Sequence, residues 1–447
     1  MRTLNADLLK DKILKALIIF ALPLLISNIF QQFYNTVDTM IVGNVLGDTS
    51  LAAIGACGAI YELMIGFALG VGNGMSIVIA RCYGAGNIKQ LRKSVAGAIA
   101  AGIFMTLVIV LVSRIWMRSL LQLLDTPDNI IEKAYSYISL ITGFAGVMFC
   151  YNLCAGILRA VGNSVMPLVF LVISSFLNIV LDYCFIKYMH TGIGGAAAAT
   201  VIAQGVSAVL CIIYIIKTNK FLVPERKDFV FDAALYKELL LQGLSMGMML
   251  SVVSAGTVIL QKAINGFGHL VIAGHVTARK LNSFLLMPNA TLATAMATFV
   301  SQNKGAGQRQ RIKDGVKIAV GLGVCWAAAA TGLVFLFGRD AVKLISGSSE
   351  PVVLDNAVLY LKINAPFYTA LVGLAVLRNS MQGLGRKIIP LFSSIIELVG
   401  KILFVIFLIP KLGYLGVIIC EPVIWCVMCA QLAFCFSVDK AFENTGA

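Results

Sequence analysis

Charged residues are scarce in this sequence. Only 13% of the 447 residues are Asp, Glu, Lys or Arg, whereas 59% are hydrophobic, and the mean hydropathy is +0.91. Soluble domains carry about 25% charged residues, so this composition excludes a soluble enzyme. Runs of about 20 apolar residues, each long enough to cross a bilayer, recur along the whole chain. The sequence therefore predicts an all-α integral membrane protein with several membrane-spanning helices.

Several motifs of other protein classes are also missing. The chain has no G-x-x-x-x-G-K-[ST] phosphate-binding loop and no soluble nucleotide domain, so it does not use ATP itself. Its eleven cysteines lie almost all in apolar segments, without the spacing of a secreted disulfide framework, and are expected to be small buried hydrophobic residues. Cys426 and Cys429 form a C-x-x-C inside an apolar run, which favours packing over a zinc or redox site. Lys10, Lys12 and Lys15 lead directly into the first apolar run, so no cleavable signal peptide is expected.

Twelve membrane spans are expected. The formal charge of +14 could suggest nucleic acid, but Lys and Arg cluster in short loops between apolar runs, where they orient helices instead. Their excess in alternate loops predicts that both termini are cytoplasmic and that no nucleic acid is bound. The expected spans are residues 13–45, 51–80, 95–117, 134–158, 166–188, 195–216, 239–266, 270–300, 316–337, 357–381, 388–409 and 417–438.

The two halves of the chain repeat each other. A shift of 221 residues aligns Asn44 with Asn265 and the triplet 84–86 with 305–307, and a slip of two residues aligns Pro167 with Pro390. We therefore expect a lobe of six helices in residues 1–220, a cytoplasmic loop at 221–238 and a second lobe of six helices at 239–447. Two lobes of equal orientation would be related by an axis along the membrane normal, with a central substrate cavity between them.

The first apolar stretch contains a carboxylate, Asp38, although apolar residues continue beyond it. A charged group inside a membrane costs at least about 2.5 kcal/mol and tends to face a partner or a water cavity. Asp38 is therefore a candidate functional group; the alternative is an interfacial residue that only ends the helix. Counting residues from the span ends places Asp38, Asp182 and Thr200 at a similar depth in the outer half of the membrane. Tyr34 shares a helix face with Asp38, as Asn178 does with Asp182.

The sequence resembles a known family. The loops Arg81–Asn87 (RCYGAGN) and Gln302–Gln308 (QNKGAGQ), the motif Asn178–Asp182 (NIVLD) and the repeat together resemble the multidrug and toxic compound extrusion (MATE) transporters, and most closely their DinF-like bacterial branch. The resemblance covers essentially the whole chain. It implies a transporter of the bacterial plasma membrane that is not an enzyme, works as a monomer and needs no cofactor besides a coupling ion.

The resemblance also implies a cation site in the first lobe. Tyr34, Asp38, Asn178, Asp182 and Thr200 match positions that line this site in the family, and would bind the coupling H⁺ or Na⁺. Two carboxylates in a medium of low dielectric constant would share one proton or one metal ion. Carboxylate and amide oxygens suit a hard cation, so Asp38, Asp182 and Asn178 could also hold Na⁺; no other metal site is expected.

Pro23 removes a backbone hydrogen bond from the first helix and so permits a kink. In the family, a proline at this place is proposed to let the helix bend when the acid is protonated. We expect Pro23 to be a hinge and Asp38 its trigger. The alternative is a static kink.

The second lobe has a different set of charges, because Ile259, Val405 and Lys401 stand where the first lobe has Asp38, Asp182 and Asn178. Glu397 and Lys401 are spaced for an ion pair, and Glu421 could pair with Lys401 or Arg279. These charges either stabilise the lobe as pairs or contact substrate. Glu62 in the second span is a further candidate for substrate specificity. The candidate residues for the substrate cavity are Glu62, Lys262, His275, Arg279, Glu397, Lys401 and Glu421.

Three functions fit these features to different degrees. The first is a secondary antiporter that exports amphipathic, mainly cationic organic compounds in exchange for H⁺ or Na⁺. The second is a flippase for lipid-linked precursors, which should have a more cationic cavity and often extra spans. The third is an intramembrane aspartyl protease, which also uses two membrane aspartates; its Y-D and G-x-G-D motifs are not matched by I-V-L-D-Y around Asp182.

Overall fold

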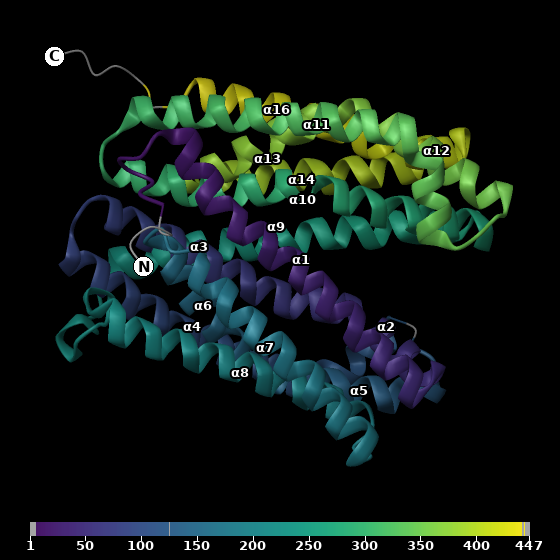
Figure 1. The fold of residues 1–447 in the computed structure, drawn as a ribbon, viewed down its shortest axis with the longest axis horizontal. Coiled ribbons are helices and arrows are strands. Elements are labelled where there is room, and N and C mark those ends of the chain that lie inside the picture. Colours follow the sequence, from purple (N-terminus) through teal and green to yellow (C-terminus); the bar gives the residue numbers. More distant parts are fainter. Residues whose placement is uncertain (1–5, 125, 440–441, 443–447) are drawn as a thin grey trace. The chain divides into compact units, whose positions relative to one another are not determined.

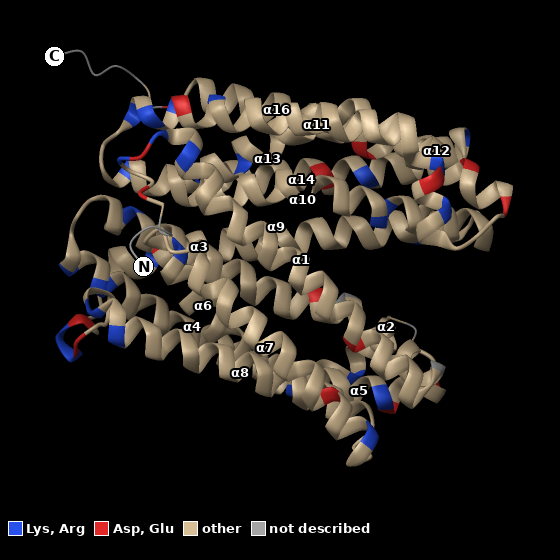
Figure 2. Ribbon diagram, in the orientation of Figure 1, with Lys and Arg blue, Asp and Glu red and all other residues tan. Residues whose placement is uncertain are grey.

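A computed structural model describes residues 6–124, 126–439 and 442, which are almost entirely helical, with no strand among them (Figure 1). Within this part of the chain, eleven helices are long and apolar enough to cross a membrane. A twelfth span is broken into α5 (Asp128–Gly143) and α6 (Ala145–Ala160), which are bent by 47°. The twelve expected spans are each matched by one of these elements. Lys, Arg, Asp and Glu lie mostly near helix ends, and only a few lie within the spans (Figure 2).

The remaining elements follow the predicted order. In the first half they are α1 (Ile13–Leu46), α2 (Asp48–Tyr61), a π-helical turn (Glu62–Gly66), α3 (Phe67–Gly84), α4 (Ile88–Leu123), α7 (Val165–Tyr183), a π-helical turn (Cys184–Tyr188) and α8 (Ile193–Thr218). Short 3₁₀ helices (Lys220–Leu222 and Arg226–Asp228) connect the halves. In the second half they are α9 (Ala233–Asn265), α10 (His269–Gly305), α11 (Arg309–Ser346), α12 (Pro351–Asn364), a 3₁₀ turn (Ala365–Phe367), α13 (Tyr368–Gly383), α14 (Ile388–Leu403), a π-helical turn (Phe404–Leu408), α15 (Ile409–Leu412) and α16 (Tyr414–Ser437).

The backbone of the two halves repeats in its details. Each half has a break in its fourth span, at Phe144 and at 365–367, and a π-helical turn in its fifth. Among the described residues, eight of the nine glycines with positive φ form four pairs related by the repeat. Such φ values are strained for residues with a Cβ, which explains why glycine stands at both members of each pair. The pairs are Gly47 with Gly268, Gly86 with Gly307, Gly162 with Gly385, and Gly192 with Gly413.

The helices pack into two units, and the boundaries between these units fall within α1 and within α9. Among the described residues, one unit comprises 6–7 and 22–251, and the other comprises 8–21, 252–439 and 442. This division differs from the predicted lobes: the connecting segment 221–238 belongs to the first unit, and α9 begins within it, at Ala233.

Close backbone contact explains why the first part of α9 packs with α3. A Cβ on Gly74 would lie 2.5 Å from the Gln242 carbonyl oxygen, and a Cβ on Gly70 would lie 2.7 Å from Gly247 Cα. Small residues of this kind let membrane helices approach closely. In the second unit, the Asn303 side chain donates a hydrogen bond to the Leu8 carbonyl (3.1 Å), which attaches the segment before α1 to the end of α10.

Candidate functional site

The five residues predicted to form the cation site come from three helices of the first unit. Tyr34 and Asp38 lie one turn apart on α1, Asn178 and Asp182 lie one turn apart on α7, and Thr200 lies on α8. Because α7 and α8 pack closely against each other, they bring Asn178 and Thr200 to one place. Tyr34, Asn178 and Thr200 line the same small pocket of about 10 Å³. This volume is close to that of one water-sized occupant.

The two acids meet beside this pocket. The Asp38 and Asp182 carboxyl groups lie within hydrogen-bonding reach of each other, and Asp182 is fully buried. Two ionised carboxylates only accept hydrogen bonds, so this contact is favourable only when a proton or another cation lies between them. The depth argument from the sequence predicted one level for these two residues, which are 144 positions apart in the chain, and the structure brings them together.

Unsatisfied polar atoms are concentrated at the same place. Asp38 Oδ1, both carboxylate oxygens of Asp182 and both amide atoms of Asn178 are buried without a hydrogen-bond partner. More than about 90% of buried polar groups in proteins have such a partner, so this cluster is an exception that needs an explanation. Its oxygens are those that a proton or a hard cation such as Na⁺ would bind. No group of three or more His, Cys, Asp and Glu that could hold a metal ion is found among the described residues.

The structure adds residues that the sequence analysis missed. Gln204 lies one helical turn after Thr200, lines the pocket and has a buried amide oxygen without a partner. The spacing rule that linked Tyr34 to Asp38 would have found it. Tyr137 on α5 lies near both Asp38 and Asp182, and Tyr61 on α2 lies near Tyr137 and Tyr34. No spacing in the sequence indicates these two tyrosines, because they belong to other helices.

Pro23 lies inside α1 and is buried. The Ser27 hydroxyl donates a hydrogen bond to the Pro23 carbonyl (2.8 Å). The packing division of α1 falls between Ala21 and Leu22, directly before this proline. Helix α1 therefore lacks a backbone hydrogen bond close to the point where it passes from one packing unit to the other. Pro23 as a hinge remains a prediction, now with a structural reason for its position.

We expect Pro23→Ala to suppress a pH-dependent change in the accessibility of α1. Single cysteines at Ile29, Phe33 and Met40, which are exposed on the second part of α1, would be labelled at high and low pH in a background without the eleven native cysteines. If α1 bends at Pro23, the labelling changes with pH in the parent protein and changes much less in Pro23→Ala. Leu22→Ala, one residue earlier, is the control and should behave like the parent. An unchanged response in Pro23→Ala would mean that the kink is static.

The charges of the second unit form ion pairs. Arg279 Nη1 lies 3.1 Å from Glu421 Oε1, and the Tyr360 hydroxyl donates to Glu421 Oε2 (2.7 Å). Of the two partners predicted for Glu421, the structure selects Arg279. His275 lies beside this pair, with Nδ1 3.2 Å from the Tyr414 hydroxyl.

A second ion pair confirms the predicted spacing on α14. Lys401 Nζ lies 2.9 Å from Glu397 Oε1, and Arg378 Nη2 lies 3.8 Å from Glu397 Oε2. Lys262 near the end of α9 is exposed, as is Glu62. These pairs favour the interpretation that the charges stabilise the second unit. Contact with substrate remains a prediction for all seven residues.

Two repeated helical units that span a membrane, with a pair of acids inside the first of them, define the class of polytopic membrane transporters. The family model named MatE matches residues 23–184 and, a second time, residues 245–407. The chain therefore belongs to the MatE family, whose members are transporters and not enzymes. The two matches also confirm the internal repeat. The hypothesis of an intramembrane aspartyl protease is wrong, because the members of the MatE family are transporters and not enzymes.

The chain is similar to curated proteins and solved structures along nearly its whole length. It is 26% identical to the probable multidrug resistance protein YoeA of Bacillus subtilis, over 94% of this chain and 92% of that protein. It is also 26% identical to the probable multidrug resistance protein YpnP of the same organism, over 81% and 80%. A solved outward-facing structure of a multidrug resistance MATE family transporter of the MOP superfamily matches with a TM-score of 0.89 and 22% identity, over 99% of each chain.

Proposed function

We propose that this protein is a secondary antiporter of the bacterial plasma membrane, with both termini in the cytoplasm. It exports amphipathic organic compounds, mainly cationic ones, in exchange for H⁺ or Na⁺. The observation that carries the proposal is the contact between Asp38 and Asp182 next to unsatisfied oxygens of the same site. The names of the relatives, which are multidrug resistance proteins, support the class of exported compound.

The acid pair would couple ion binding to conformation. In a medium of low dielectric constant, two carboxylates in contact cannot both remain charged, so the site has high affinity for one cation. When the ion leaves, repulsion between Asp38 on α1 and Asp182 on α7 favours a conformation in which these helices separate. Pro23 would give α1 the freedom to bend during this change. The ion can shift the balance between the two conformations by no more than the difference in its binding free energy to them.

Transport by purified protein in liposomes tests this proposal. A panel of cationic, zwitterionic and anionic compounds would be offered under an imposed proton gradient and, separately, under an imposed sodium gradient. We expect at least one cationic compound to move against its own gradient, driven by one of the two ions, because the acid pair binds a single cation. Liposomes without protein are the control. Failure of both gradients to move any compound, with translocation of a lipid-linked precursor instead, would favour the flippase.

A further inference from the structure

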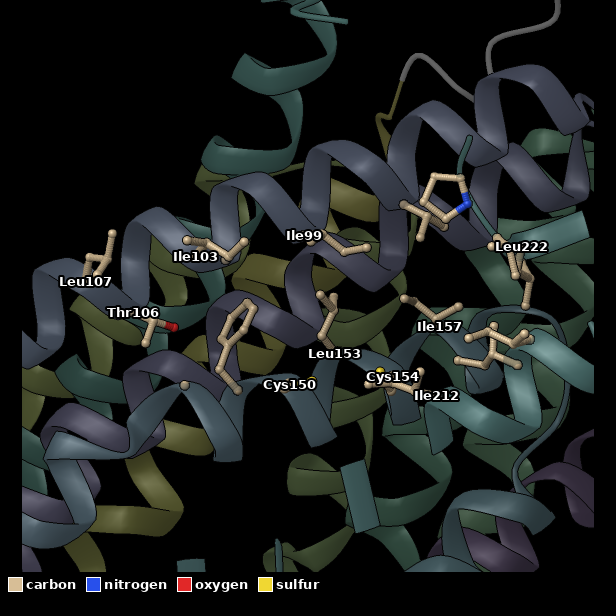
Figure 3. A pocket seen from close by; sticks show the side chains of 18 residues that line it. Ile99, Ile103, Thr106, Leu107, Cys150, Leu153, Cys154, Ile157, Ile212 and Leu222 are labelled. Atoms are coloured by element: carbon tan, nitrogen blue, oxygen red, sulfur yellow. The ribbon is translucent and has the colours of Figure 1, made fainter. Parts of the chain in front are cut away.

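A long apolar groove lies in the first unit, away from the acid pair. It runs between α4 and α8, and α6, which packs against both helices, forms its floor. Figure 3 shows Ile99, Ile103 and Leu107 along α4, opposite Cys150 and Cys154 of α6, with Leu222 at one end. Its volume is about 420 Å³. Thr106 and the cysteine thiols contribute the few polar atoms of its side chains, so the groove suits a hydrocarbon ligand.

The sequence builds the floor of this groove with small residues. A Cβ on Gly102 of α4 would lie 2.1 Å from the Phe149 ring, so only glycine lets this ring pack against the α4 backbone. A Cβ on Gly146 of α6 would lie 3.0 Å from the Thr106 methyl carbon. These contacts bring α4 and α6 together below the groove. The rim residues Ile103 and Leu107 remain 59% and 62% exposed, so the groove is open at the lipid-facing surface.

The length of the groove matches one leaflet of a bilayer. Its lining on α4 extends from Val95 to Leu107, which corresponds to about 18 Å along the helix axis. Half of the hydrocarbon core of a bilayer is about 15 Å thick. A groove of this length can hold an acyl chain along its axis. One end is closed by Leu222, Val223 and Pro224 of the segment that connects the two halves.

Basic residues are close in sequence to the segments that form this closed end. The α4 start and residues 217–228 together contain seven basic residues and two acidic ones. Glu225 is already paired, with Arg92 (2.5 Å) and Lys227 (2.7 Å), and Asp228 is buried. Lys217 and Lys220 are exposed and make no ion pair within the described part of the chain. The seven basic residues are Lys89, Arg92, Lys93, Lys217, Lys220, Arg226 and Lys227.

We propose that this groove binds one phospholipid with an anionic headgroup. One acyl chain lies between α4 and α8 over α6, and the headgroup phosphate contacts Lys217 and Lys220. This end of the groove lies on the side predicted to be cytoplasmic, where basic segments next to a membrane attract anionic lipids. An apolar compound without charge would fill the groove but leave these lysines without a partner. The lipid site is independent of the acid pair and of the coupling ion.

Native mass spectrometry of the purified full chain, titrated with phosphatidylglycerol or phosphatidylcholine, tests this site. We expect the wild type to retain one phosphatidylglycerol more tightly than phosphatidylcholine. Each lysine next to an anionic headgroup contributes about fivefold in affinity, so Lys217→Gln with Lys220→Gln should weaken the binding of phosphatidylglycerol about 25-fold. The affinity for phosphatidylcholine should stay unchanged. Ile99→Trp, which fills the middle of the groove, should weaken the binding of both lipids.

Two matched variants serve as controls. Lys317→Gln with Lys411→Gln removes the same charge from exposed positions of the second unit, and Phe104→Trp places the same ring at an exposed position of α4 that does not line the groove. Both should bind lipid like the wild type. Equal affinity of the wild type for the two lipids, or equal losses in the control variants, would overturn the proposal. Competition by glycerol 3-phosphate as effective as that by phosphatidylglycerol would also overturn it, because the basic cluster would then bind a phosphate without the acyl chain.

Discussion

Asp38→Asn and Asp182→Asn are each expected to reduce gradient-driven transport in liposomes to the level of liposomes without protein. Each change leaves a single acid, which no longer needs a cation to relieve repulsion from its neighbour. The free energy of ion binding then differs little between the two conformations. A decrease of only about 1.4 kcal/mol in this difference lowers the ratio of the two ion affinities tenfold, and this ratio limits how far ion binding can drive transport. The measurement is the initial rate of dye uptake under the driving ion, and we expect a decrease of at least about tenfold.

The stability of these two variants should not fall with their activity. Two buried carboxylates in contact repel unless a cation neutralises them, so a neutral amide at either position should leave the melting temperature equal or higher. Asp355→Asn is the matched control, because Asp355 is an exposed acid that pairs with Arg339 on the surface (2.9 Å). It should transport like the wild type. Uptake that persists in both Asp38→Asn and Asp182→Asn would show that the acid pair does not couple transport.

Glu397→Gln should destabilise the second unit severely, whereas Lys401→Met should have a much smaller effect. Glu397 is the shared partner of two cations, the buried Lys401 and the largely buried Arg378, and its removal leaves both without an ion pair. Breaking a buried ion pair by removing one partner costs about 3–5 kcal/mol. For a unit of about 200 residues, such a loss corresponds to a decrease of about 6–20 °C in melting temperature. Lys401→Met leaves Glu397 with Arg378, so no buried charge loses its only partner.

Thermal unfolding of the purified variants in one detergent measures this asymmetry. Glu132→Gln is the control, because Glu132 pairs with Arg118 on the surface, where both side chains are more than 60% exposed. Exposed pairs contribute about 0–1 kcal/mol, so this variant should melt like the wild type. Equal melting temperatures for Glu397→Gln and Lys401→Met would show that Glu397 is not the common partner of the two cations.

Helix periodicity and membrane depth explain why much of the candidate site could be predicted. A membrane span has a nearly fixed length, so counting residues from its ends gives the depth of a side chain. This argument placed Asp38 and Asp182 at one level, and the structure brings them into contact. Residues four apart on one helix, such as Glu397 and Lys401, were likewise found from spacing alone.

Contacts between helices could not be predicted in the same way. Rotation of a helix about its axis is set by its neighbours, so depth alone does not say which residues of other helices face the acids. Tyr61 and Tyr137 were missed for this reason, and Arg279 could not be preferred over Lys401 as the partner of Glu421. The packing division within α1 and α9 depends on contacts such as Gly74 with Gln242, which carry no signal in hydropathy.

The sequence by itself determined the class, the twelve spans, the internal repeat and the levels of the buried acids, because each follows from how apolar and charged residues are spaced along one helix or one half. Only the tertiary structure decided which side chains meet, where the packing units divide, and that a leaflet-long apolar groove ends at a basic cluster. These features arise from the packing of different helices against one another. That packing depends on side-chain volume at close contacts, and the hydrophobic pattern along a single helix does not contain it.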